Sequence, residues 1–103
     1  MYSIQFTREA LLDIEDIAIW YEEQRKGLSF DFELCLEVGV NEILRTPKAY
    51  QKRYGKIKIR FINRFPYGIH YIIKEDLIII IAVFHTSRSP ENWSKRKNFN
   101  RNK

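Results

Sequence analysis

The sequence has little of what secreted or membrane-spanning proteins need. Its single cysteine, Cys35, cannot form a disulfide within the chain. Residues 1–9 show no basic start followed by an apolar run, so no signal peptide is expected. The longest apolar run, residues 77–84, has the length of a strand and falls far short of the roughly 20 residues that span a bilayer. We therefore expect a cytoplasmic protein.

Residue patterns that bind metals or cofactors are also missing. Two histidines and one cysteine, far apart in the sequence, do not form a zinc pattern. The four glycines are isolated, so there is no glycine-rich phosphate loop. No Ser-His-Asp arrangement is supported by the sequence. We expect no cofactor and no bound metal.

The composition is that of a small folded domain. The chain has 103 residues, of which 45% are hydrophobic and 15% aromatic, and this is too apolar for a disordered protein. The length suits one domain. We expect a single domain over residues 1–97 and a flexible basic tail over residues 98–103.

Charge is unevenly distributed along the chain. Residues 1–46 contain four Lys/Arg and ten Asp/Glu, a net charge of −6, whereas residues 47–103 carry fourteen against three, a net of +11. A basic half of this size favours an acidic or polyanionic partner. The alternative is a solubilising surface with a frayed basic tail.

The first half of the chain predicts a strand followed by two helices. Residues 2–6 alternate between apolar and polar, as in a short strand. Thr7 can cap a helix that ends near residues 25–27, where cations and a glycine suit a helix C-terminus. Ser29 is predicted to cap a second helix, which Pro47 ends. The turn is so short that the helices should form an antiparallel hairpin.

Apolar residues recur at helical spacing in both helices, which predicts one packed face on each. The glycine within the second helix, Gly39, is expected to allow close approach between the two helices. The predicted packed positions are Ala10, Leu11, Ile14, Ile17, Ala18 and Tyr21 in the first helix, and Phe32, Leu36, Val40, Ile43 and Leu44 in the second.

The second half predicts a meander of three strands. Residues 56–62 and 67–73 alternate, and residues 77–84 are apolar on both faces, as in a central strand. A last short helix is expected to begin at Pro90 and to carry Trp93.

Together these elements predict an α+β fold, with an N-terminal strand, an antiparallel helix hairpin packed on one face of a small antiparallel β-sheet, and a short C-terminal helix. In residues 56–62, the apolar positions should face the helices and the basic ones the opposite side. The sheet face away from the helices would then carry Lys58, Arg60 and His70, with Arg64, His85 and Arg88 at strand ends nearby.

Over nearly its whole length the chain resembles the RelE/ParE toxin superfamily, and its motifs resemble the ParE-like branch most. The motifs are Ala-Leu-Leu-Asp-Ile-Glu-Asp-Ile at residues 10–17 with Trp20-Tyr21 following, Ile-Leu-Arg-Thr-Pro at 43–47, Arg-Phe-Pro-Tyr-Gly-Ile-His-Tyr at 64–71, and His-Thr-Ser-Arg-Ser-Pro-Glu-Asn-Trp at 85–93. Each motif alone is weak, but their order in a basic chain of this size is specific.

The resemblance implies the toxin of a type II toxin–antitoxin system, a growth inhibitor neutralised by a cognate antitoxin. The ParE-like branch poisons DNA gyrase, whereas the RelE-like branch cleaves mRNA on the ribosome. We expect gyrase poisoning; the alternatives are a ribosome-dependent mRNA endoribonuclease and a non-toxic relative that still binds its antitoxin. Operator DNA would be contacted only through the antitoxin.

Three residues would carry the chemistry if the chain were a ribonuclease. His85 would be the general acid or base, and Arg60 and Arg88 would hold the phosphate. Against this, Gly68 stands where the ribonuclease branch tends to place an arginine. Trp93, near the C-terminus, cannot exchange protons as the tyrosine or histidine often found there in the ribonucleases does.

Other residues are candidates for binding the target or the antitoxin. Structural alternatives stay open: His85 and Arg88 would pin the C-terminal segment to the sheet, and an aromatic residue would simply pack on the core. The candidates are Lys58, Arg64, His70, Trp20, Tyr21 and Trp93.

Overall fold

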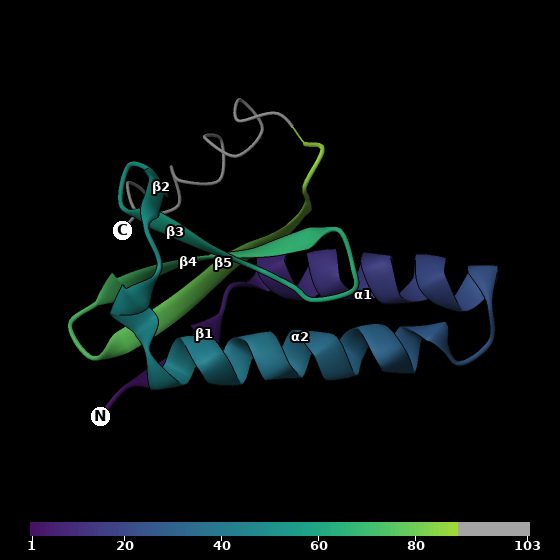
Figure 1. The fold of residues 1–103 in the computed structure, drawn as a ribbon, viewed down its shortest axis with the longest axis horizontal. Helices are drawn as coiled ribbons and strands as arrows, with labels where there is room; N and C mark the ends of the chain where they lie inside the picture. The colour runs from purple at the N-terminus through teal and green to yellow at the C-terminus, as the bar shows by residue number, and fades with distance from the viewer. Residues whose placement is uncertain (89–103) are drawn as a thin grey trace.

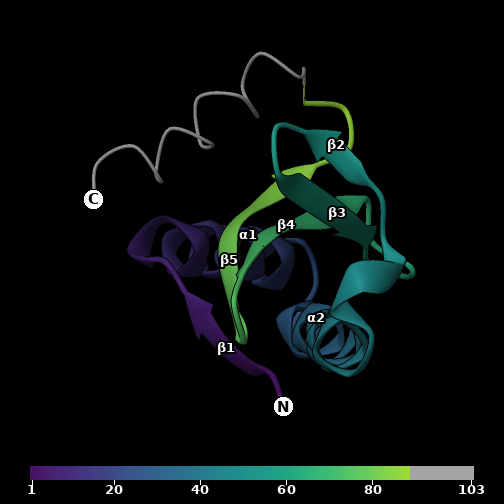
Figure 2. The ribbon, with the colours of Figure 1, turned by 90° about the vertical axis from the view of Figure 1, so that its left-hand side faces the viewer.

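The computed structural model describes residues 1–88 and shows a helix hairpin lying across one face of a β-sheet (Figures 1 and 2). The predicted helix at Pro90, Trp93 and the tail at residues 98–103 lie outside the described residues. The elements are β1 (Ser3–Phe6), α1 (Arg8–Gln24), α2 (Leu28–Arg45), the short 3-10 helix η1 (Pro47–Ala49), β2 (Lys52–Tyr54), β3 (Ile57–Phe61), β4 (Tyr67–Lys74) and β5 (Leu77–His85).

The five strands form one mixed sheet in the order β1-β5-β4-β3-β2. The meander of β3, β4 and β5 is confirmed, and β5 lies inside the sheet between β1 and β4. The prediction of an antiparallel sheet is wrong at one edge, because β1 runs parallel to β5, from Ser3 beside Leu77 to Phe6 beside Ile80. A parallel pair needs a long crossover connection, and the hairpin and the meander together supply it.

β2 and η1 were not predicted. β2 has only three residues and pairs with β3 through an irregular register, so it carries no alternating pattern. A tight turn at Gly55, which has a φ of 53°, joins the two strands. This left-handed conformation favours glycine, so an isolated glycine was the one local sign of the turn.

The helix starts differ in how they are capped. The predicted cap at Thr7 is confirmed, since its side chain accepts a hydrogen bond of 3.1 Å from the Ala10 backbone N–H. The predicted cap at Ser29 is wrong, because α2 begins at Leu28 and its N-cap is the left-handed Gly27, two residues before Ser29. The carboxylate of Glu22 takes over this role and accepts hydrogen bonds from the Gly27 and Ser29 backbone N–H groups and from the Ser29 hydroxyl.

Gly39 allows α2 to approach the sheet, and the prediction that it serves the contact between the helices is wrong. A Cβ at this position would lie 2.9 Å from Ile69 Cδ1 and 3.2 Å from Arg60 Nη1. Since Ile69 lies in β4 and Arg60 in β3, the missing side chain leaves room for the strands beneath the helix.

The prediction for the two faces of β3 is also wrong. Arg60 lies under α2, whereas Ile57 belongs to a second apolar cluster on the opposite face. The other members of this cluster are Ile72, Ile79, Ile81, Ala82 and Phe84, with Tyr54 and Leu77 packed against them. Because both faces of the sheet are apolar, alternation alone does not specify which face the helices cover.

A side chain of α1 completes the hydrogen bonding of β5 where β1 ends. β1 pairs with β5 only as far as Ile80, and β5 bulges at the next residue, where its register against β4 shifts. Beyond the bulge, the backbone N–H of Val83 donates a 3.0 Å hydrogen bond to the Asp13 carboxylate. Asp13 therefore ties the first helix to the sheet.

Candidate functional site

His85 ends β5 with an exposed imidazole ring. Its Nδ1 accepts a hydrogen bond of 3.0 Å from the Ser87 backbone N–H, and the Ser87 hydroxyl lies 2.8 Å from the same nitrogen. Since Nδ1 is an acceptor, the neutral ring carries its proton on Nε2. The ring also meets the Tyr67 ring edge-on, with centroids 5.2 Å apart.

Arg88 is held close to His85 in sequence but contacts the other face of the sheet. Its guanidinium lies 4.2 Å from the centroid of the Phe84 ring, within the range of a cation–π interaction, and its backbone N–H donates to the His85 carbonyl. Phe84 and His85 are successive residues of one strand, so their side chains point to opposite faces. The side chains of His85 and Arg88, two of the three predicted ribonuclease residues, therefore contact opposite faces of the sheet.

Arg60 is buried, with 7% of its surface exposed, and so does not lie on the open face where it was predicted. Its guanidinium forms an ion pair with Glu42 of α2 and donates a 2.6 Å hydrogen bond to the Phe61 carbonyl. Burial by itself lowers the pKa of Arg60, but hydrogen bonds to Glu42 and Tyr50 outweigh this and raise the pKa above its ordinary value. Arg60 thus joins α2 to β3.

Lys58 and His70 are likewise engaged within the fold. The Lys58 ammonium donates to the Tyr50 carbonyl on the helix side of the sheet, which corrects its predicted face. His70 does lie on the face away from the helices, but it is 1% exposed, and its Nδ1 lies 2.8 Å from the Tyr54 hydroxyl. His70 is therefore buried, and Lys58 is half-buried on the helix side of the sheet.

Arg64 lies exposed in the connection between β3 and β4 and has the left-handed backbone conformation, with a φ of 73°. Its guanidinium lies 5.9 Å from the centroid of the Phe65 ring. Of the predicted cationic residues, Arg64 and Arg88 are therefore the two that remain exposed, and both are placed against aromatic rings.

Trp20 and Tyr21 have different environments. Tyr21 is buried among the rings of Phe32, Phe65 and Tyr67, and burial, reinforced by the neighbouring Tyr67, raises its pKa. Trp20 is 53% exposed and meets the Tyr21 ring edge-on at 5.1 Å. Tyr21 is a core residue, and Trp20 is available to a partner.

Both helices expose large apolar side chains, and of these only Trp20 was predicted to bind a partner. In α2 these are Phe30, Leu34 and Val38, spaced by four residues and so aligned on one side of the helix; we call them the α2 stripe. In α1 they are Leu11, Leu12, Ile19 and Trp20. The predicted packed positions Leu11 and Leu44 are wrong, since both side chains are exposed. The four-residue spacing of Phe30, Leu34 and Val38 was the signal that could have identified the α2 stripe.

Comparison with known proteins identifies the family of the chain. The family model described as the ParE toxin of the type II toxin-antitoxin system, parDE, matches residues 4–90. The chain belongs to the ParE toxin family. The resemblance stated from the sequence is thereby confirmed.

The fold of this ParE-family chain is shared by a solved structure, that of a chromosomal ParDE TA system from P. aeruginosa. The two agree with a TM-score of 0.75 at 16% sequence identity, over 84% of this chain and 98% of the other. At this identity the agreement concerns the fold. No curated protein sequence matches the chain.

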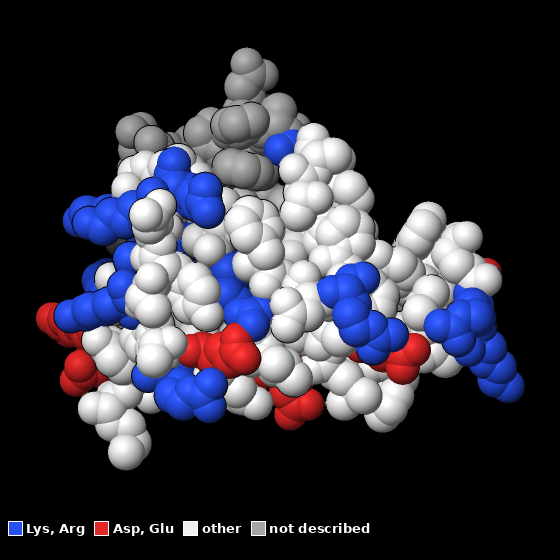
Figure 3. Space-filling view, viewed as in Figure 1, with Lys and Arg blue, Asp and Glu red and all other residues white. Residues whose placement is uncertain are grey.

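A hollow lined by lysines lies at the end of the sheet where β2 is found. It encloses about 480 Å³ and is lined by Lys48, Lys52, Lys56, Lys58, Ile73 and Glu75; we call it the lysine hollow. Figure 3 shows Lys and Arg side chains gathered on this side of the molecule. This ParE-family chain therefore concentrates positive charge at the end of the sheet.

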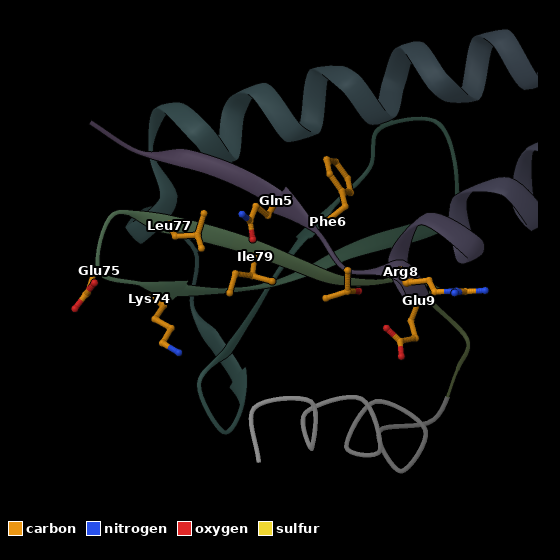
Figure 4. A pocket seen from close by; sticks show the side chains of 9 residues that line it. Gln5, Phe6, Arg8, Glu9, Lys74, Glu75, Leu77 and Ile79 are labelled. Atoms are coloured by element: carbon orange, nitrogen blue, oxygen red, sulfur yellow. The ribbon is translucent and has the colours of Figure 1, made fainter. Parts of the chain in front are cut away.

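A second hollow, of about 550 Å³, lies beside β1 (Figure 4). Side chains of both charges line it, with Lys74 and Glu75 at one end and Arg8 and Glu9 at the other. It therefore presents no single charge to a ligand. Across residues 1–88, no group of three or more His, Cys, Asp or Glu side chains is placed to hold a metal ion. No helix in the same range is long and apolar enough to cross a membrane.

Proposed function

We propose that this chain is a cytoplasmic growth inhibitor that poisons DNA gyrase and that a cognate antitoxin neutralises it. The observation that carries the proposal is the match to the ParE toxin family over residues 4–90, which covers every described strand and helix except Ser3, the first residue of β1. The environment of Arg60 supports a binder rather than a nuclease. Its guanidinium is already engaged by Glu42 and by a backbone carbonyl, so it is not free to grip a phosphate.

The exposed apolar surface of the hairpin is the proposed antitoxin site. The α2 stripe presents three apolar side chains at a spacing that suits an amphipathic segment laid along the helix. Two exposed carboxylates, Glu33 and Glu37, lie on the same helix, each one residue before a member of the α2 stripe. We therefore expect an antitoxin segment whose apolar residues are flanked by Lys or Arg. The operator sequence would be recognised only through the antitoxin.

Replacing Phe30 and Leu34 together with alanine tests this surface. Each truncation removes an apolar anchor, so we expect antitoxin affinity to fall roughly 100-fold for the pair. The matched control replaces Glu33 and Glu37 with alanine, which alters the same helix but should lower affinity less than about tenfold. Isothermal titration with the antitoxin encoded beside the toxin gives both values. Equal losses in the two variants would show that the α2 stripe is not the anchor.

The target is tested by inducing the chain in a bacterium that lacks the antitoxin. Growth, incorporation of radiolabelled amino acids and the DNA-damage response are followed together during the first minutes. A damage response with filamentous cells and continued synthesis is expected. In a purified system, adding the chain to gyrase and plasmid should also increase the amount of cleaved plasmid that is recovered when the reaction is stopped with a denaturant. Immediate loss of protein synthesis without DNA damage would contradict gyrase poisoning, and unchanged growth would favour the non-toxic relative.

The second candidate, a ribosome-dependent mRNA endoribonuclease, is favoured by one observation. His85 is exposed at the end of β5, so its imidazole, a group that can act as an acid or a base, is accessible to an RNA substrate. In this reading His85 is the acid or base and Arg88 holds the phosphate, whereas Arg60, the third predicted residue, is engaged by Glu42. His85→Ala should then lower the cleavage rate by about 10²-fold or more. Toxicity that persists in His85→Ala, together with gyrase-linked damage, would refute the ribonuclease.

A further inference from the structure

We propose that the lysine hollow binds phosphate groups on the backbone of duplex DNA. The proposal deepens the proposed function and rests on it for its ligand, because duplex DNA is the substrate that gyrase holds. It assigns the basic end of the sheet a role separate from that of the apolar hairpin.

The lysines reach the hollow from four different segments of the chain. Lys48 comes from η1, Lys52 from β2, Lys56 from the turn after β2, and Lys58 from β3. Lys58 is half-buried and fixed by its bond to the Tyr50 carbonyl, while the other three are exposed. Within residues 1–88, the ion pairs formed by lysine or arginine involve only Arg25 and Arg60. The ammonium groups of the hollow are therefore not neutralised by paired carboxylates.

Protection of a sheet edge explains only part of this arrangement. β2 is an edge strand, and a lysine on an edge strand discourages pairing with another chain, which accounts for Lys52. Lys48 and Lys56 lie outside the strand, so they have no edge to protect. Their convergence on one hollow with Lys58 needs another reason, and a multiply charged anion supplies it.

The chemistry of the hollow favours phosphate over an acidic protein surface. Protein–protein interfaces are depleted in lysine and rely on aromatic, methionine and arginine anchors, whereas the hollow offers four lysines and one apolar residue, Ile73. DNA backbones are gripped mainly by lysine and arginine. Only Glu75 opposes the positive charge in the lining.

The charge distribution also orients the molecule on DNA. Residues 1–46, which include both helices, have a net charge of −6, whereas residues 47–88 contain nine Lys/Arg and two Asp/Glu, a net of +7. The hairpin should therefore repel a polyanion, whereas residues 47–88, which include the lysine hollow, should attract it. The α2 stripe is left free for a protein partner while DNA is bound.

The test measures binding of the full chain to a labelled 20-base-pair duplex by fluorescence anisotropy from about 50 to 200 mM salt. The variant is Lys48→Gln/Lys52→Gln/Lys56→Gln, which spares Lys58 and its bond to Tyr50. The matched control is Arg8→Gln/Arg25→Gln/Lys26→Gln, which removes the same charge from the hairpin. Circular dichroism confirms that both variants are folded. Residues 89–103 are unchanged in both, so their contribution to binding cancels.

The lysine variant should bind at least about tenfold more weakly at 50 mM salt, and the salt dependence of its affinity should be shallower by about 2 to 3 in log–log slope, since each phosphate contact contributes about 0.9. The control should keep the slope of the unaltered chain. Equal losses in both variants would overturn the site, because net charge alone would then explain binding. Stronger lysine-dependent binding to a duplex RNA or to a polyglutamate peptide would overturn the assignment to DNA.

The outcome is separable from that of the gyrase proposal, because no gyrase is present in the binding assay. A lysine-dependent DNA interaction without plasmid cleavage by gyrase would keep the site and reject the target. If the lysine variant instead binds DNA as well as the unaltered chain and still causes full plasmid cleavage by gyrase, the site is rejected and the target is kept.

Discussion

The ion pair between Arg60 and Glu42 should make the two partners unequal in their effect on stability. Arg60 carries its charge into the space between α2 and β3, and its side chain is 8% exposed, whereas that of Glu42 is 35% exposed. Removing the carboxylate therefore leaves a buried cation without its main partner. Removing the guanidinium leaves a carboxylate that water can reach. The first change should cost more than the second.

The magnitude follows from these exposures. Breaking a fully buried pair by removing one partner costs about 3–5 kcal/mol. Since water reaches Glu42 and the Phe61 carbonyl still accepts from Arg60, we expect about 2 kcal/mol for Glu42→Ala. Arg60→Met preserves the bulk of the side chain that fits beside Gly39, and we expect it to cost about 1 kcal/mol. Glu42→Gln keeps an acceptor and should lie between Glu42→Ala and the unaltered chain.

Urea unfolding followed by circular dichroism measures these free energies. In the double variant Arg60→Met/Glu42→Ala no buried charge is left unpaired. Its free energy of unfolding should therefore lie within about 0.5 kcal/mol of that of Arg60→Met alone. If Arg60→Met costs as much as Glu42→Ala, or if the two costs simply add, the unequal burial of the partners does not control the stability of the pair, and the reasoning is refuted.

Three further predictions concern the helices. Asp13→Ala should cost about 1–3 kcal/mol in urea unfolding because it leaves the buried Val83 N–H without this acceptor, and Asp13→Asn should recover most of the loss; equal losses would exclude this role. Gly39→Ala should lower the Tm despite better helix propensity, by about 1–2 kcal/mol in stability, because its Cβ would press on the fully buried Ile69; an increase in Tm would contradict the close approach. Hydrogen bonds from Ser29 lower the pKa of Glu22, so the stabilising effect of the carboxylate should be present above the ordinary pKa of 4.5 and be lost as the pH falls through the lowered pKa. The Tm of the unaltered chain should therefore exceed that of Glu22→Gln near neutral pH and equal it in acid. A difference in Tm that persists in acid would exclude the carboxylate as its source.

Local sequence patterns predicted the elements well because their causes are local. Thr7 caps α1 through a bond to a residue three positions away, and the apolar spacing of the helices follows directly from their period. The interior position of β5 also followed from its composition, since a strand that is apolar on both faces must be covered on both.

Long-range relations were the ones that local patterns missed. The parallel pairing of β1 with β5 joins residues more than seventy positions apart, and nothing near Ser3 specifies the strand direction of its partner. The capping role of Glu22 depends on where the hairpin turn brings the start of α2, which the sequence around Ser29 does not show. The α2 stripe was overlooked because only one apolar face of that helix was expected.

The error at Arg60 shows why the candidate site was harder to predict than the fold. A basic residue on an alternating strand marks the exposed face of a sheet only when the opposite face is the sole apolar one. Here both faces are apolar, and a long arginine can be buried if a carboxylate and a carbonyl meet it. Glu42 lies eighteen residues away in a different helix, so its partnership with Arg60 arises only from the packing of α2 on β3. The type of a side chain predicted the chemistry available to it, whereas its partners decided whether that chemistry serves the fold or a ligand. By the same argument, the lysines that no described carboxylate neutralises are the cations of this chain best placed to act on something outside it.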